Sequence, residues 1–441
     1  MNRLHRAWWS VLWLCLPALA ESAPAALALG DALRLAVAAD PWLVGSQYRE
    51  EALLSEATAA GSLPDPKLNI AAGNLPLDTF DVNQEAMTQF TVGVSQAFPR
   101  GDSRALSRQQ RTQLAEQEPL LREERSAQVQ RTVTQLWFTA YLAQETIGLV
   151  EQSRGLFDQL LEAAGTRYSA ALGSTRQQDL VRAQLELTRL EDRLTGMQQR
   201  RDAAQRQLAE WIGADATLPL APPPRDSSSI SAAVLRASSQ QYRDWIVRHP
   251  AVRAVDRRID AVTTEVELAR QGYRPAWGVS AQYGYRDDDP MGRDRADLFS
   301  VGVTLDLPLF TDDRQDQQVS ATLARVEALR TERQLLARRL LAELETALAR
   351  LQRVDERADL YATRLLPQMA DQAEAALAAY NNDDGDFAEA VRARIAQLDA
   401  RMASLAIAVE RQQLMASIHY LTVAAGYGHA QAPAQQMGET Q

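Results

Sequence analysis

Phe90-Thr91-Val92-Gly93-Val94 and Phe299-Ser300-Val301-Gly302-Val303 are two stretches of the 441-residue chain with nearly the same sequence pattern. Each alternates an apolar side chain with a small or polar one, which is typical of a β-strand that has one apolar and one polar face. A proline, Pro99 or Pro308, follows each stretch at the same spacing, and the two stretches lie 209 residues apart (299 − 90). This pattern indicates an internal duplication.

The same offset of 209 recurs elsewhere, because Asp40-Pro41 matches His249-Pro250. Each repeat is expected to run helix, strand, strand, long helix, turn, long helix. Consecutive prolines and serines separate the two repeats and predict a linker. The expected organisation is a signal peptide at 1–20, a first repeat at 21–217, a linker at 218–229, a second repeat at 230–425 and a disordered tail at 426–441.

The first twenty residues have the features of a secretory signal. A basic start precedes an apolar stretch from Trp8 to Leu19, and Ala18-Leu19-Ala20 is a small-x-small cleavage site. An uncleaved anchor is the less favoured alternative, because the apolar stretch is shorter than the roughly 20 residues that span a bilayer. Cys15, the only cysteine, lies inside this signal, so the mature chain is expected to contain no disulfide. Acylation of Cys15 is disfavoured because Leu14, rather than a small residue, precedes it.

Long helices should make up most of the remaining chain. Helices are expected over 41–62 and 241–272, and much longer ones over 102–166 and 313–379, where only Pro119 and Pro367 interrupt the pattern. A helix of 65 residues would be roughly 100 Å long. The apolar positions recur three and four apart, as in the seam of a coiled coil: Val129, Val133, Leu136 and Ala140; Leu187, Leu190, Leu194 and Met197; Leu341, Leu344, Leu348 and Leu351; Ile395, Leu398, Met402 and Leu405.

Four short segments, near 68–72, 90–94, 277–285 and 299–307, alternate as strands. Such strands fit either a transmembrane barrel, with lipid on one side and water on the other, or a sheet packed against helices in a soluble protein. Long polar loops at 74–88 and 286–298 favour the barrel. The side chains expected to face lipid are Phe90, Val92, Val94, Trp277, Val279, Tyr283, Phe299, Val301 and Val303.

Four strands cannot close a barrel, since an open sheet would leave two unpaired edges in hydrocarbon. The chain is therefore expected to oligomerise, and a dimer or a trimer would satisfy this requirement. The fold class is mainly α with a small β part.

The composition and motifs give no indication of an enzyme. The formal net charge of −10 argues against a nucleic-acid partner. The three histidines of the mature chain, His249, His419 and His429, lack metal-ligand spacing. No nucleophile motif or phosphate-binding loop is present. We therefore expect no catalytic residue, no cofactor and no metal site.

Two turns between long helices carry related signatures, Arg167-Tyr168 with Gly173-Ser174, and Tyr380 with Gly385. With the duplication and the strand order, they make the chain resemble the TolC family of outer-membrane efflux proteins, although the family's turns are usually shorter between Tyr and Gly. The heavy-metal branch, of the cobalt-zinc-cadmium type, is suggested by three further stretches: Leu63–Leu68, Tyr273–Trp277 and Leu307–Phe310.

The resemblance implies a homotrimer in the outer membrane of a Gram-negative bacterium. Twelve strands would form a barrel in outer-membrane lipid, and twelve helices a periplasmic tunnel. The six turn residues would dock on a periplasmic adaptor protein, which joins the duct to an inner-membrane pump of the RND type. The family's tunnels close near these turns, often with acidic rings.

Four acids within seven residues, Asp383, Asp384, Asp386 and Glu389, are the candidates for this periplasmic gate. Repeated around a trimer axis, they would attract cations. Asp386 could instead be the N-cap of the following helix.

The interpretation is a passive duct for efflux, with heavy-metal cations as its cargo. The alternatives are a periplasmic coiled-coil scaffold or adaptor without a barrel, and a duct for drugs or secreted proteins.

Overall fold

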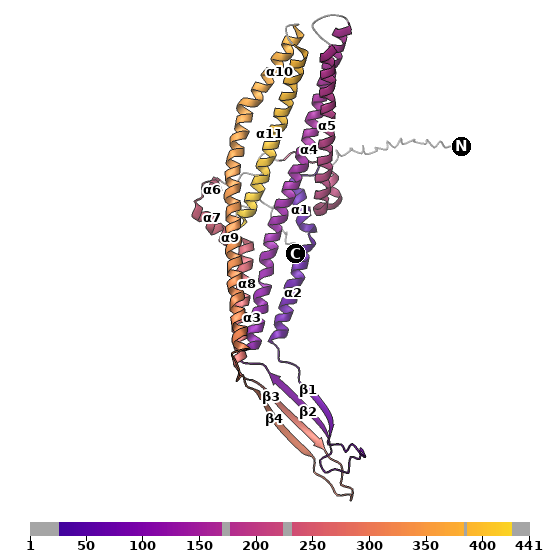
Figure 1. Ribbon diagram of the computed structural model, residues 1–441, viewed down its shortest axis with the longest axis vertical. Helices are drawn as coiled ribbons and strands as arrows, with labels where there is room; N and C mark the ends of the chain where they lie inside the picture. Colours follow the sequence, from indigo (N-terminus) through magenta and orange to yellow (C-terminus); the bar gives the residue numbers. More distant parts are fainter. Residues whose placement is uncertain (1–25, 170–176, 224–231, 383–385, 426–441) are drawn as a thin grey trace, which may run out of the picture.

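The chain forms an elongated structure in which long helices make up most of the length and a small sheet lies at one end (Figure 1). The computed structural model describes residues 26–169, 177–223, 232–382 and 386–425. The first half contains α1 (Leu29–Ala39), α2 (Pro41–Gly61), β1 (Lys67–Gly73), β2 (Gln89–Phe98), α3 (Ser103–Ala115), α4 (Gln117–Ser169), α5 (Gln177–Ile212) and η1 (Gly213–Thr217). The second half contains α6 (Ala232–Leu235), α7 (Ser239–Arg248), α8 (Pro250–Arg270), η2 (Gln271–Tyr273), β3 (Ala276–Tyr285), β4 (Leu298–Asp306), α9 (Gln315–Leu360), η3 (Tyr361–Leu365), α10 (Leu366–Asn381), α11 (Phe387–Leu421) and η4 (Val423–Ala425).

The helices α2 and α8 begin at the two duplicated X-Pro pairs. Asp40 caps α2 by accepting a hydrogen bond from the Trp42 N–H at 3.0 Å. His249 caps α8 in the same way, since its Nδ1 accepts from the Ala251 N–H at 3.2 Å. In both cases proline occupies the first helical position, where its fixed φ suits the helix and its missing N–H costs nothing.

The single helix expected over residues 241–272 is wrong. The chain forms α7 and α8, which are separated at His249. The reason is Pro250, because a proline disfavours helical geometry in the residue before it. The helix α1 was not expected. It precedes α2 in the first repeat, as α7 precedes α8 in the second.

The two longest helical stretches are interrupted near their prolines. The stretch containing Pro119 divides at Glu116 into α3 and the 53-residue α4, which is about 80 Å long. Near Pro367 the chain forms the π-helical turn η3 between α9 and α10. A proline cannot donate a backbone hydrogen bond, and such local rewinding satisfies the neighbouring carbonyls.

The predicted apolar seams form the helical core. Val129, Val133 and Ala140 of α4 are fully buried, and they pack with α1 and α5 around Trp137. In the second half, Leu344 and Leu351 of α9 pack with α7 and α11. The coiled-coil interpretation of these helices is confirmed.

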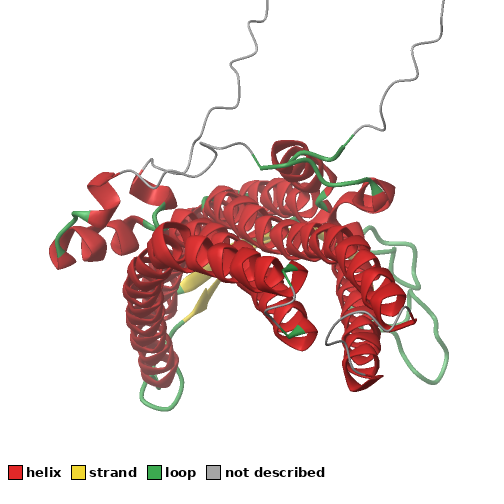
Figure 2. Ribbon diagram, turned by 90° about the horizontal axis from the view of Figure 1, so that it is seen from above, coloured by secondary structure: helices red, strands yellow, loops and turns green. Residues whose placement is uncertain are grey.

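The helices lie side by side in a curved layer that follows an arc when seen end-on (Figure 2). In its upper part α4 packs against α5 and α11, and α11 packs against α9. In its lower part α3 packs between α2 and α8, and α8 packs against α9. The short α6 and α7, at the left edge of both views, lie outside this arc.

Two pairs of helices in this layer meet end to end, α5 with α2 and α11 with α8. We call the two meeting points the first and the second joint. At the first joint, the end of α5 and the start of α2 meet at Arg125, whose guanidinium lies 5.4 Å from the Trp211 ring and 2.7 Å from the Asp40 carboxylate. At the second joint, α11 ends where α8 begins, and His249 Nε2 lies 3.1 Å from the Tyr420 carbonyl oxygen.

The four strands form one antiparallel sheet in the order β1-β2-β3-β4. The pair β2–β3 joins the two halves of the chain. Both β1 and β4 have one edge that pairs with no other strand in the described chain.

Candidate functional site

One face of the sheet is apolar across all four strands. Strand pairing places Ile70, Val92 and Tyr283 side by side, because directly opposite residues in an antiparallel sheet point to the same face. Tyr283 in turn pairs with Phe299. The register therefore brings all nine residues predicted to face lipid onto one face, together with Leu68, Ile70, Tyr285 and Leu305. These side chains are exposed in the single chain, from 37% at Val279 to 72% at Phe299.

The opposite face of the sheet carries small and polar side chains, such as Thr91, Ser280 and Thr304. Glycine permits close approach on this face, since a Cβ at Gly302 would lie 2.8 Å from the Ser280 hydroxyl. Lys67, the only lysine of the chain, is exposed at the start of β1 on the same face. A sheet with one apolar face and one polar face is suited to separate lipid from water.

Aromatic side chains lie at both ends of the apolar face. Phe98 and Trp277 stack at the end next to the helices, with ring centroids 4.1 Å apart. Phe90, Tyr285 and Phe299 lie toward the loops at the other end. Between these ends the face is mainly valine. Aromatic rings at two levels around an aliphatic band are typical of membrane-spanning sheets.

The two long loops beyond the sheet are joined by arginines of the second loop. Arg286 donates to the Ala86 carbonyl at 3.4 Å, and Arg295 donates to the Glu85 carbonyl at 3.2 Å. The two hairpins therefore act as one unit at the end far from the helices.

Ion pairs between the halves of the chain fix the junction of sheet and helices. Arg100, after β2, pairs with Asp306 at the end of β4, and Arg274 pairs with Asp102 at 2.8 Å. Gly101 has φ +44°, and a Cβ there would lie 2.4 Å from the Arg274 side chain. A side chain at this position would therefore displace Arg274.

The helix tips contain the predicted docking and gate residues. Tyr380 is buried and packs against Phe387, with ring centroids 5.2 Å apart, so it holds α10 and α11 together. Asp386 is the N-cap of α11 and accepts a hydrogen bond from the Ala388 N–H at 3.2 Å. Glu389 is exposed in the first turn of α11. Arg167 and Tyr168 belong to α4, but their side chains lie outside the described part; so do the whole residues Gly173, Ser174, Asp383, Asp384 and Gly385.

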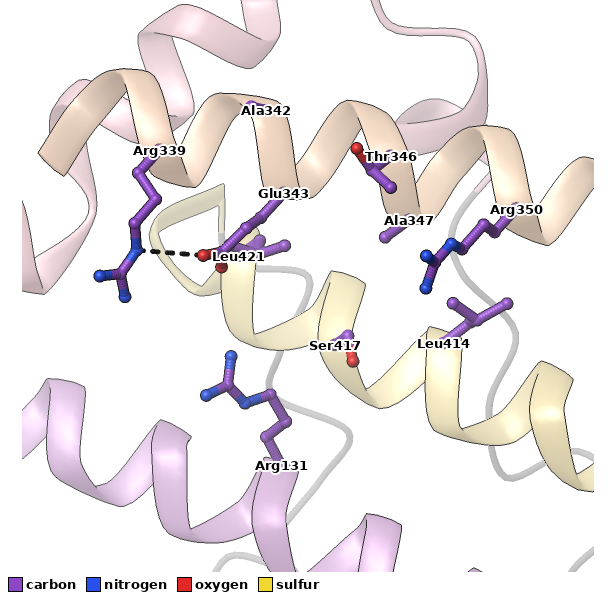
Figure 3. Close-up of a pocket in the computed structure, with 10 residues that line it drawn as sticks. All are labelled: Arg131, Arg339, Ala342, Glu343, Thr346, Ala347, Arg350, Leu414, Ser417 and Leu421. Atoms are coloured by element: carbon purple, nitrogen blue, oxygen red, sulfur yellow. Dashed lines mark hydrogen bonds and ion pairs between the residues drawn. The ribbon is translucent and has the colours of Figure 1, made fainter. Parts of the chain in front are cut away.

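A groove with a volume of about 400 Å³ runs along α11 near the second joint, between α4 and α9 (Figure 3). Arg131 from α4 and Arg350 from α9 extend toward α11 from opposite sides. We call it the arginine groove, and its lining residues are Arg131, Arg339, Ala342, Glu343, Thr346, Ala347, Arg350, Leu414, Ser417 and Leu421. No sequence pattern predicted this groove, because its residues come from three helices far apart in the chain.

Tyr420 and His249 lie beside this groove, at the second joint. The Arg131 guanidinium lies over the Tyr420 ring at 4.1 Å, and the Tyr420 hydroxyl donates to Glu124 at 2.9 Å. Burial raises the pKa of Tyr420. Burial lowers the pKa of His249, because a charged imidazole is disfavoured away from water.

None of the described helices is long and apolar enough to cross a membrane. In the same part of the chain, no group of three or more His, Cys, Asp or Glu side chains could hold a metal ion.

The mainly helical architecture with a small antiparallel sheet matches the fold of solved outer-membrane channels. Residues 242–422 match the protein family described as outer membrane efflux protein. No curated protein matches the chain.

Solved structures of outer-membrane channels share this fold over most of their length. CusC has a TM-score of 0.74 and 15% identity, with 89% of this chain and 91% of CusC covered. The outer-membrane channel OprN has a TM-score of 0.72 and 18% identity, with 91% of each chain covered. The outer membrane protein VceC from Vibrio cholerae has a TM-score of 0.71 and 17% identity, with 89% of this chain and 96% of VceC covered.

Proposed function

We propose that the chain is the outer-membrane duct of a tripartite efflux system, with its sheet in the outer membrane and its helices in the periplasm. The observation that carries this proposal is the exposed apolar face, which continues across all four strands. Exposed apolar patches of this extent mark a surface that meets lipid or protein. The duct is passive and not an enzyme, because its cargo moves through it without chemical change.

Three copies form the duct in this proposal. The open edges of β1 and β4 require partner strands, since unpaired backbone groups are costly in hydrocarbon. The curved helical layer is compatible with three copies closing into a tube (Figure 2). The result would be a twelve-stranded barrel above a tunnel of twelve helices.

The partners are a periplasmic adaptor and an inner-membrane pump of the RND type. The proposed docking site is the helix tips, which lie at the opposite end of the molecule from the sheet (Figure 1). It comprises Arg167, Tyr168, Gly173, Ser174, Tyr380 and Gly385. Replacing Gly173 and Gly385 with isoleucine should stop export and leave trimer formation unchanged; continued export would exclude the tips as the docking site.

Heavy-metal cations are the proposed cargo. The support is the resemblance of three short stretches to the heavy-metal branch, at Leu63–Leu68, Tyr273–Trp277 and Leu307–Phe310. The proposed gate is the acidic group Asp383, Asp384, Asp386 and Glu389. For Asp386 and Glu389, exposure at the tip of α11 leaves both carboxylates accessible to cations.

A matched pair of substitutions in β4 tests the proposal. Val301 lies on the apolar face, and its neighbour Ser300 lies on the polar face. Val301→Arg should prevent membrane insertion, because arginine facing the bilayer midplane costs about 2–4 kcal/mol. Ser300→Arg should still give a heat-sensitive trimer in outer membranes after a high-salt wash.

Equal recovery of both variants in the membrane fraction would contradict the assignment of the two faces. Release of the wild-type chain by the salt wash as a soluble monomer would instead indicate a periplasmic scaffold or adaptor.

A further inference from the structure

The arginine groove opens on the side of the helical layer that α1 and α7 do not cover. Among the described residues, its lining comes from α4, α9 and α11 alone. On α4, Arg131 is two residues from both Val129 and Val133, which are buried in the cluster that contains α1. At 100° per residue, Arg131 therefore points to the opposite side of the helix. Since α7 lies outside the arc in Figure 2, the groove faces the inner side of the arc.

The groove carries an excess of positive charge. Glu343 is already paired with Arg339 at 3.1 Å. Arg131 lies on the Tyr420 ring, which holds its guanidinium in place. Among the described residues, neither Arg131 nor Arg350 forms an ion pair with a carboxylate. Two guanidiniums on opposite sides of the groove are thus available to an anion.

The groove also offers apolar surface between the charges. Leu414 and Leu421 of α11 form its floor, and the Ser417 hydroxyl lies between them (Figure 3). A planar guanidinium donates two parallel hydrogen bonds to carboxylate, sulfonate or phosphate oxygens. The combination fits an organic anion that has a flat apolar body and more than one charged group.

We propose that the arginine groove binds organic anions from the lumen of the duct. The proposal rests on the proposed function, which makes the inner side of the arc the wall of a tunnel. Three copies would place a cationic belt near the middle of the tunnel, away from the acidic tips. Anions would be held there by long-range attraction in a confined space.

The test is block of single channels in a planar bilayer by 1,5-naphthalenedisulfonate, a dianion too polar to enter the bilayer. The wild-type channel should be blocked in a concentration-dependent manner. Arg131→Gln and Arg350→Gln should each weaken the block about tenfold, as expected for the loss of one charge-assisted contact. The double variant should weaken it further.

Arg353→Gln is the matched control. Arg353 lies on the same helix, three residues after Arg350, and it pairs with Glu356 at 2.6 Å outside the groove. This variant should retain the wild-type block. An unchanged block in the double variant, or an equal loss in Arg353→Gln, would overturn the proposal.

Equilibrium dialysis of the detergent-solubilised full chain separates this proposal from the proposed function, because it requires no pore. If the wild-type chain makes no channel but binds the disulfonate, and the double variant does not, the groove is correct and the duct is not. If channels form and neither protein binds the disulfonate, the duct is correct and the groove is not. Circular dichroism confirms that each variant folds.

Discussion

The two joints of the helical layer have the same backbone geometry and different chemistry. Both place an X-Pro pair at the start of a helix, and in both the residue before proline caps that helix. At the first joint the capping group is a carboxylate that pairs with Arg125 at 2.7 Å. At the second joint it is a fully buried imidazole that contacts the carbonyl of Tyr420.

The difference shows that a duplicated position can keep its structural role, the capping of a helix, while the charge of the capping side chain changes. Because His249 Nδ1 accepts the Ala251 N–H, its proton must be on Nε2, which donates to the Tyr420 carbonyl. The neutral ring therefore satisfies both of its neighbours. Asp40 needs its charge, whereas His249 needs to remain uncharged.

Removing the charged cap should have the largest effect. Asp40→Ala deletes the cap of α2 and leaves Arg125 half-buried without its carboxylate. We expect a loss of about 3 kcal/mol in the free energy of unfolding, by analogy with broken buried ion pairs. The measurement is urea unfolding of the detergent-solubilised protein, followed by circular dichroism.

Asp31→Ala provides the control, because Asp31 lies in the first turn of α1 and, within the described part of the chain, its side chain forms only an exposed pair with Arg34. Its effect should stay below about 0.5 kcal/mol. If the two variants were equally stable, the ion pair at the first joint would contribute nothing beyond a surface contact.

Acid should weaken the second joint by a smaller amount. Burial lowers the pKa of His249 in the folded chain, so the unfolded chain binds the proton more readily. The stability contributed by the neutral ring is then complete above the unfolded pKa of about 6.5 and is lost as the pH falls below it. Unfolding midpoints of wild type and His249→Asn should therefore converge or cross between about pH 7 and pH 5.

His419 has a pKa lowered by the same cause, burial, but it makes no cap. His419→Asn therefore controls for the general cost of a half-buried imidazole. If the stability of His249→Asn fell with acid as steeply as that of wild type, the second joint would not be the acid-sensitive element.

The smallest effect should come from giving α1, which precedes the first joint, a side-chain cap like the one that α7 has before the second joint. Ser238 caps α7 in a capping box with Gln241, whereas Ala28 precedes α1 and provides no side-chain cap. Ala28 already has extended backbone angles suited to a cap, φ −77° and ψ 150°. Ala28→Ser should stabilise the chain by about 0.5 kcal/mol in the same urea assay. A destabilised variant would show that the Ala28 position has no room for a hydroxyl.

Periodic features of the fold could be predicted from the sequence. The alternation around Val92 and Val301 identified strands and their shared apolar face, because side chains on a strand alternate strictly. The recurrence of Leu344 and Leu351 at helical spacing identified the seams. Pro119 and Pro367 marked helix interruptions, although the break near Pro119 falls three residues earlier, at Glu116.

Features that depend on distant contacts could not be predicted. The contact of His249 with the Tyr420 carbonyl is one of them. The division of the helix at His249 was missed for another reason, since Pro250 was a local signal that the expected helix over 241–272 overlooked. Arg131 and Arg350 look like ordinary exposed arginines in their own helices, and only the packing of α11 between α4 and α9 brings them to one groove. The buried position of Tyr380 likewise depends on Phe387, which lies across the turn.

The single lysine has a practical consequence for measuring the orientation of the chain. Lys67 is exposed at the start of β1, at the end of the sheet next to the helices, and provides the only side-chain primary amine in the sequence. An amine-reactive reagent that cannot cross membranes would therefore label a single side chain at a known position along the molecule, in addition to the amino terminus. In the proposed orientation, Lys67 lies on the water-filled side of the barrel, between the exterior and the proposed gate at the helix tips. The reagent added to intact cells should therefore acylate Lys67 through the barrel even when the gate is closed.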